Sequence, residues 1–216
     1  MVDTEVVWNV HTHKENETTS CILQKFPENI NQSSRFFSFG IHPMQADLHS
    51  FEEVFRMYKE VENKKGFVAI GEIGLDTRYP QMDVQESIFI LQLKKAEELQ
   101  KPVILHSVNT WDRCRFLHSE YAPSVSLIYH GFNKARITDH VLAYDSSIFS
   151  FGEAILHNEL LQNQLKNIPL DKIVIETDTS DVQIIDIYIV VAKLKEITLQ
   201  QLMNQINKNV NKIFKL

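Results

Sequence analysis

Six side chains of the kinds that bind metals in proteins each end a short apolar run of this chain. They are His11, His13, Glu72, His106, His130 and Asp178. An apolar run that ends in a ligand predicts a buried strand with the ligand at its end, and parallel strands in a barrel bring such ends to one rim. The pattern therefore predicts a metal site, and with it metal-dependent hydrolysis.

The ligand set contains four imidazoles and two carboxylates but no thiolate, which suits zinc, manganese, iron or magnesium. Residues two apart in a strand share a face, so His11 and His13 are expected to point the same way. Glu72 lies between Gly71 and Gly74, and its two oxygens could bridge two ions. Two divalent ions about 3.5–4 Å apart can activate a water for hydrolysis.

The same residues have plainer interpretations when they are taken singly. His106 or His130 alone would be a hydrogen-bonded core histidine, and Asp178 alone would cap the next helix. Only their joint occurrence at strand ends favours the metal site.

Three further residues follow predicted strands and are candidates for contact with substrate. His42, in the string GIHP, could contact substrate, support a metal ligand or simply form a turn. Arg78 and Lys134 could supply positive charge to an anionic substrate, or could be ordinary surface residues.

Two acidic residues lie beside the predicted ligands. Asp76 could orient a ligand or cap the next element. Glu176 shares the face of Asp178 and could support a ligand or form a buried ion pair. The remaining histidines fall in helical patterns and are predicted to be solvated: His49, His118, His140 and His157.

Short apolar runs alternate with longer segments of helical periodicity. The predicted strands are 5–11, 20–26, 36–41, 67–72, 102–106, 125–130, 147–152 and 172–177, and the predicted helices are 49–64, 84–100, 110–120, 134–143, 153–166, 181–195 and 198–214. Thr198 is the expected N-cap of the last helix. This alternation predicts an α/β protein, a TIM-type (β/α) barrel of seven or eight parallel strands, as one domain over 1–216.

The stretch from His13 to Phe36 has room for a short strand but not for a full helix. It is rich in Asn, Glu, Ser and Thr, which is typical of a loop. The first helix of the barrel is therefore predicted to be missing or abbreviated, with a thin or open wall there.

The net charge of −6 and the pI near 5.8 exclude a protein that coats nucleic acid through a basic surface, but not a nuclease with a local cationic site. Cys21 and Cys114 form no CxxC motif and are expected to be reduced thiols. We expect no signal peptide, no membrane span, no obligate protein partner and a cytoplasmic location.

The strings HTH, GIHP, AIGEIGLD, KPVILHS, YHGF and IETD occur in this order, and the chain resembles the TatD family of metal-dependent hydrolases over nearly its whole length. The resemblance implies a TIM-type barrel and a deoxyribonuclease that acts on DNA ends. It implies that His11 and His13 hold one ion, that Glu72 bridges to a second ion held by His106 and His130, and that Asp178 binds the first ion and acts as base or proton shuttle.

The chain departs from the family pattern where phosphate could be held. Val108 stands where many members have Arg, and the loop after Asp178 runs into a helix almost at once. These departures keep two alternatives open. The same site could hydrolyse a small phosphoester, an ester (including an aminoacyl-tRNA-type ester) or an amide, or the barrel could bind metal without catalysis.

Overall fold

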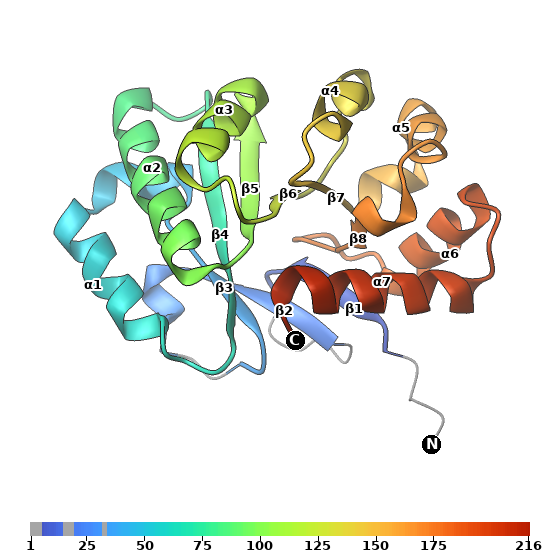
Figure 1. The fold of residues 1–216 in the computed structure, drawn as a ribbon, viewed down its shortest axis with the longest axis horizontal. Coiled ribbons are helices and arrows are strands. Elements are labelled where there is room, and N and C mark those ends of the chain that lie inside the picture. The colour runs from blue at the N-terminus through green and yellow to red at the C-terminus, as the bar shows by residue number, and fades with distance from the viewer. Residues whose placement is uncertain (1–5, 15–19, 32–33) are drawn as a thin grey trace. The chain divides into compact units, whose positions relative to one another are not determined.

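The computed structural model describes residues 6–14, 20–31 and 34–216 (Figure 1). Its strands are β1 (Trp8–Thr12), β2 (Ser20–Lys25), β3 (Phe37–Phe39), β4 (Phe67–Asp76), β5 (Val103–Val108), β6 (Leu127–Tyr129), β7 (Ser147–Phe151) and β8 (Ile173–Ile175). They follow one another in the sheet in chain order. Eight strands in chain order with helices between them confirm the predicted (β/α) barrel.

Seven α-helices and five 3₁₀ helices are seen among the described residues. The α-helices are α1 (Phe51–Val61), α2 (Met82–Leu99), α3 (Trp111–Tyr121), α4 (Thr138–Leu142), α5 (Glu159–Leu165), α6 (Ile184–Leu194) and α7 (Leu199–Phe214), and the 3₁₀ helices are η1 (Pro27–Asn29), η2 (Pro43–Leu48), η3 (Ala135–Ile137), η4 (Glu153–Leu156) and η5 (Leu170–Lys172). Each predicted helix is confirmed, two of them partly as 3₁₀ turns. No described helix has the length and apolar content needed to span a bilayer.

The chain divides into two compact units. The terminal unit comprises residues 1–23 and 130–216, and the central unit comprises residues 24–129. The single domain expected from the sequence stays a prediction.

In the terminal unit, β1 pairs in parallel with β2, and β7 pairs in parallel with β8. Thr12, the last residue of β1, forms a parallel bridge to Asp178, just beyond β8. Asn9 is fully buried, and its side chain accepts the Thr177 N–H at 3.0 Å and donates to the Thr177 hydroxyl at 2.7 Å. The ends of β1 and β8 are therefore held together by both backbone and side chains.

In the central unit, β3, β4, β5 and β6 pair in parallel, and all ten residues of β4 are buried. Helices α2 and α3 pack on β4 and β5 (Figure 1). Gly74 lies opposite His106, and a Cβ at Gly74 would lie 1.8 Å from the His106 carbonyl oxygen. Only glycine permits this approach, which brings the functional ends of β4 and β5 side by side.

A side-chain cap begins the last helix, as the sequence predicts. The Thr198 hydroxyl accepts the Gln201 N–H at 3.2 Å, and the Gln201 side chain accepts the Thr198 N–H at 2.8 Å. This reciprocal pair confirms Thr198 as the N-cap of α7. Ser50 and Glu53 form the same arrangement at the start of α1.

The described residues between β1 and β3 contain η1 and no α-helix. Residue 5 of the predicted first strand, and parts of the predicted loop at 15–19 and 32–33, lie outside the described residues. The missing or abbreviated first helix is confirmed by the spacing of the strands, because β1 ends at Thr12 and β2 already begins at Ser20, while η1 lies after β2.

The prediction that His118 is solvated was wrong. Its side chain is fully buried in the central unit, because His118 shares the inner face of α3 with Cys114 and Leu117 at helical spacing. His140 and His157 are exposed, as predicted, and His49 is half-buried.

Acid is expected to destabilise the protein through His118. Burial lowers the pKa of His118 to about 4, whereas in the unfolded chain it is near 6.5. Between these two pKa values the unfolded state binds a proton that the folded state does not bind. The contribution of neutral His118 to the free energy of unfolding is therefore fully present above pH 6.5 and falls by about 3 kcal/mol as the pH approaches 4.

Urea unfolding of wild type and His118→Gln at pH 7.5 and 4.5 measures this effect, because all other groups titrate in both proteins. A smaller loss of stability in the variant is expected. Equal losses in the two proteins would show that His118 does not contribute.

Candidate metal centre

Four of the predicted ligands belong to the terminal unit and meet around Asp178. The Asp178 Oδ1 atom lies 3.3 Å from His13 Nε2 and 3.6 Å from His11 Nε2. The rings of His11 and His130 have centroids 4.8 Å apart. One ligand atom each of His11, His130 and Asp178 lies within 4.8 Å of the other two. We call His11, His13, His130 and Asp178 the terminal cluster.

The backbone fixes Asp178 in an unusual conformation. Its φ is +54°, in the left-handed region that Asp and Asn tolerate better than most residues. Its N–H donates to the His11 carbonyl at 3.0 Å, and its own carbonyl accepts the His13 N–H at 3.2 Å. Both hydrogen bonds run to the ligand-bearing segment of β1, so the strand pairing itself places the carboxylate beside the imidazoles.

Asp178 is a charged acceptor at neutral pH. Its partial burial would raise its pKa, but the neighbouring imidazoles of His11 and His13 outweigh burial and hold the pKa well below its usual range. A charged carboxylate among three imidazoles is a set of donor atoms that suits a divalent cation.

The other two predicted ligands belong to the central unit and meet there with His42. The His106 Nδ1 atom lies 2.5 Å from Glu72 Oε1, and His42 Nε2 lies 3.7 Å from the same oxygen. The rings of His42 and His106 are 4.3 Å apart and steeply inclined at 68°. We call Glu72, His106 and His42 the central cluster, whose ligand atoms lie within 4.8 Å of one another.

Asp76 contacts the imidazole of His106 on the side away from Glu72. Its Oδ2 atom lies 2.9 Å from His106 Nε2, and the carboxylate is fully buried. Burial would raise the pKa of Asp76, but hydrogen bonds from Arg78 and His106 outweigh it and hold the pKa below its usual range. Asp76 is therefore ionised and can only accept, so His106 Nε2 carries the hydrogen.

The close contact of His106 with Glu72 allows two arrangements. The His106 Nδ1 atom and the Glu72 carboxylate oxygen, 2.5 Å apart, can either share a proton or bind one cation side by side. The residues thus fit a divalent ion held by His106 Nδ1 and Glu72, with Asp76 as the carboxylate behind the histidine.

Replacing Asp76 with Asn is expected to weaken metal affinity at the central cluster about 10- to 100-fold, because carboxylates behind a ligating histidine have effects of that size. Competition with a chromophoric chelator measures the affinity. Asp47→Asn is the control, since Asp47 is an exposed acid of the same unit. Wild-type affinity in Asp76→Asn would rule out the supporting role.

Glu176 has a comparable place in the terminal unit. It is fully buried, and its carboxylate accepts the Gly131 N–H at 2.5 Å and the hydroxyl of Ser150. Its Oε1 atom also lies 3.4 Å from His130 Nδ1. Of the two interpretations left open by the sequence, this geometry favours support of His130.

The roles of two buried glutamines of α2 were not predicted from the sequence. Gln85 accepts the Asp76 N–H at 2.9 Å and donates to the Asp76 carbonyl at 3.2 Å. Gln92 accepts the Ile41 N–H at 2.7 Å and donates to the Ile41 carbonyl at 3.1 Å. Their spacing of seven residues within an apolar helix face was the available signal, because buried amides need defined partners.

The predicted substrate contacts have different surroundings. The Arg78 guanidinium binds both carboxylate oxygens of Asp76, yet its side chain is 60% exposed. Lys134 is half-buried and precedes η3, where its carbonyl accepts the Ile137 N–H. The structure brings only His42 into a cluster with predicted ligands.

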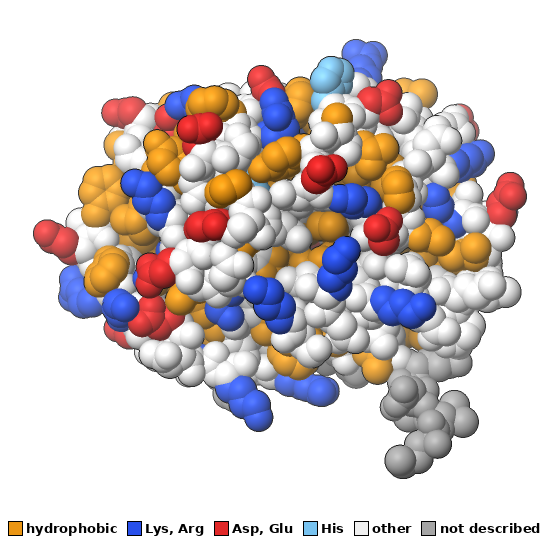
Figure 2. Space-filling view, in the orientation of Figure 1, with side chains coloured by type: hydrophobic (Ala, Val, Ile, Leu, Met, Phe, Trp, Pro, Cys, Tyr) orange, Lys and Arg blue, Asp and Glu red, His pale blue; other side chains and the backbone are white. Residues whose placement is uncertain are grey.

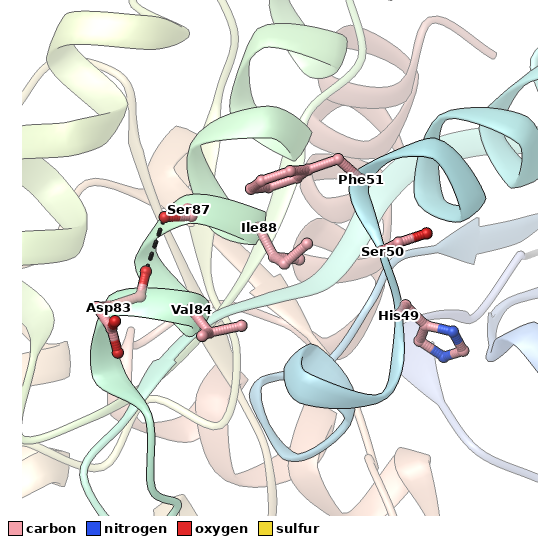
Figure 3. A pocket seen from close by; sticks show the side chains of 7 residues that line it. All are labelled: His49, Ser50, Phe51, Asp83, Val84, Ser87 and Ile88. Atoms are coloured by element: carbon pink, nitrogen blue, oxygen red, sulfur yellow. Dashed lines mark hydrogen bonds between the residues drawn. The ribbon is translucent and has the colours of Figure 1, made fainter.

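A pocket of about 300 Å³ lies elsewhere in the central unit, between the start of α1 and the first half of α2 (Figure 3). It is lined by His49, Ser50, Phe51, Asp83, Val84, Ser87 and Ile88. None of the predicted ligands lines it, so the candidate chemistry lies in the two clusters and not in this pocket.

Enzymes with a parallel α/β barrel have their active sites at the ends of the strands, where the predicted ligands of this chain lie. A comparison with known families matches residues 3–215 to the family described as TatD related DNase. The chain belongs to this family.

Curated relatives agree with this assignment. The chain is 33% identical over 149 residues to the uncharacterized metal-dependent hydrolase YcfH of Escherichia coli K12, covering 66% of this chain and 55% of that protein. It is 33% identical over 162 residues to the putative deoxyribonuclease tatdn3 of Danio rerio, covering 67% of this chain and 58% of that protein. The matches span little more than half the length of these relatives.

Solved structures show the same fold. The crystal structure of YJJV, a TatD homolog from Escherichia coli K12, superposes with a TM-score of 0.83 at 20% identity, covering 97% of this chain and 98% of the other. A TatD family hydrolase from Entamoeba histolytica gives 0.77 at 17% identity, with 98% of each chain covered.

Proposed function

We propose that this protein is a metal-dependent hydrolase that cleaves phosphodiester bonds at DNA ends. The observation that carries the proposal is the gathering of Glu72 and His106, with Asp76 behind the histidine, in the central cluster, because these nitrogen and oxygen donors suit a divalent cation. The family and the printed name of the zebrafish relative, a putative deoxyribonuclease, favour DNA as substrate.

Two sets of side chains would hold two divalent ions. His11, His13 and Asp178 would hold one, together with His130, which the family resemblance assigns to the second ion but which lies beside His11 and Asp178. Glu72 with His106 would hold the other. A bound divalent ion polarises a phosphoryl oxygen and lowers the pKa of water. The ligand types allow zinc, manganese, iron or magnesium.

Asp178 would also handle the proton of the attacking water. Its carboxylate is ionised at neutral pH and is held in place through both of its backbone hydrogen bonds. One oxygen can therefore accept a hydrogen bond from water and take up its proton as the new P–O bond forms and the ester bond from phosphorus to the leaving oxygen breaks, with that oxygen taking a proton from solvent. Its lowered pKa makes it a weak base, so orientation of the water is the larger part of this role.

The charge of the molecule limits how DNA would be held. Acidic and basic side chains are interspersed on the face in Figure 2, and the net charge is −6. Affinity would therefore come from local contacts, among which Arg78 and Lys134 stay candidates. Cys21 and Cys114 form no disulfide. We propose a cytoplasmic location, where thiols stay reduced.

A smaller substrate is the second candidate. Val108, at the end of β5, offers no charge to a phosphate, and Lys14 beside the loop after Asp178 is bound to the Ser180 carbonyl and to Asp181. Because fewer cationic side chains would then hold a long polyanion such as DNA, these features favour a small phosphoester, ester or amide as substrate.

Degradation of end-labelled single-stranded DNA, with and without a chelator, tests the first candidate against the second. Chelator-sensitive shortening from an end is expected. Intact DNA together with turnover of a small ester would favour the second candidate. Bound metal without turnover of any substrate would favour a non-catalytic protein.

A further inference from the structure

His42 begins η2 and caps it with its own ring. The His42 backbone is extended, with φ −66° and ψ 148°, and its Nδ1 atom accepts the Met44 N–H at 3.1 Å. A backbone N–H can only donate, so the lone pair of Nδ1 is occupied and cannot carry the hydrogen of the neutral ring.

It follows that the other ring nitrogen is always protonated. Nε2 carries a hydrogen in the neutral ring with this hydrogen bond and also in the charged ring. A nitrogen that carries a hydrogen has no lone pair for a metal. His42 is therefore not a ligand in this arrangement, although its Nε2 lies within 4.8 Å of the ligand atoms of Glu72 and His106.

The surroundings of His42 keep the ring in this position. Gln92 holds both backbone groups of the preceding Ile41, and the His106 ring packs at 4.3 Å against that of His42. Tyr79 packs edge-on at 6.1 Å, and the His42 side chain is only 9% exposed. A ring confined on these sides presents Nε2–H toward the Glu72 carboxylate, 3.7 Å away.

We propose that His42 is a substrate-binding donor whose Nε2–H binds an anionic oxygen of a phosphoryl group at the central cluster. This inference rests on the proposed function, because it takes phosphate as the chemical class of the substrate. A donor fixed in advance costs no reorganisation when charge develops on that oxygen.

The chain offers a variant that separates the donor from the cap. Asn is among the best N-cap residues, so His42→Asn keeps an acceptor for the Met44 N–H and removes the Nε2 donor. His42→Gln returns an N–H near the Nε2 position. His49→Phe, seven residues along the same segment, is the control histidine.

The test measures zinc content and the binding of inorganic phosphate to the zinc-loaded full chain by calorimetry. We expect His42→Asn to keep wild-type zinc content but to bind phosphate at least about 10-fold more weakly, a loss in the range for one charge-assisted hydrogen bond. His42→Gln should recover part of the affinity, and His49→Phe should match wild type.

Two results would overturn the inference. Loss of one zinc equivalent in His42→Asn would make His42 a ligand, and unchanged phosphate binding would remove its role as donor. Cleavage of DNA by the wild-type protein is measured in a separate assay. A wild-type protein that binds phosphate through His42 but cleaves no DNA supports the inference and rejects the proposed nuclease.

Discussion

Glu72→Gln is expected to lower metal-dependent hydrolysis by about 10³-fold, because removing a charged ligand forfeits several kcal/mol of charge stabilisation by the ion. Gln has nearly the shape of Glu, so the ten buried residues of β4 should stay packed. Its amide would leave one neutral oxygen near His106 Nδ1, where the wild type has a carboxylate. Steady-state cleavage of labelled DNA with added metal measures the rate.

Glu86→Gln is the matched control for this substitution. Glu86 is an acid of the same unit that pairs with Arg113 at the surface, and its loss should leave activity within a factor of two or so. If Glu72→Gln retained full chelator-sensitive activity, the central cluster could not be part of the reaction site.

Asp178→Asn is expected to lower the rate by roughly 10²- to 10⁴-fold, the range for loss of a positioned proton acceptor. Asn tolerates the left-handed backbone at φ +54° about as well as Asp does. The hydrogen bonds to the His11 and His13 backbone should therefore survive, and unfolding by urea should change little.

Asp181→Asn serves as control for this second substitution. Asp181 is exposed, three residues along the chain, and pairs with Lys14. A rate in Asp178→Asn equal to that of this control would exclude any catalytic part for Asp178.

The sequence predicted the ligand-bearing strands because buried parallel strands read as apolar runs with a clear end. His106 and Asp178, which end such runs, lie in the central and terminal clusters. Helix ends were predictable where a cap such as Thr198 is visible in the sequence.

Features set by tertiary packing could not be predicted in this way. His118 was placed on the solvent side because polarity alone does not say which helix face meets the sheet. The bidentate pairing of Arg78 with Asp76 depends on side-chain geometry, which spacing does not specify.

The role of His42 was open in the sequence for a similar reason. Which ring nitrogen is protonated depends on the Met44 N–H, a contact made only when η2 forms. The 3₁₀ turn itself was not predicted, so the choice between ligand, donor and turn residue needed the structure.

The most direct test is the number of divalent ions bound per chain, measured by elemental analysis after zinc loading and gel filtration. The proposed function predicts about two equivalents for wild type and about one for Glu72→Gln, with the remaining ion lost when His11→Ala and His13→Ala are added. A wild-type protein that retains no zinc, or a zinc content that none of these substitutions changes, would contradict the account.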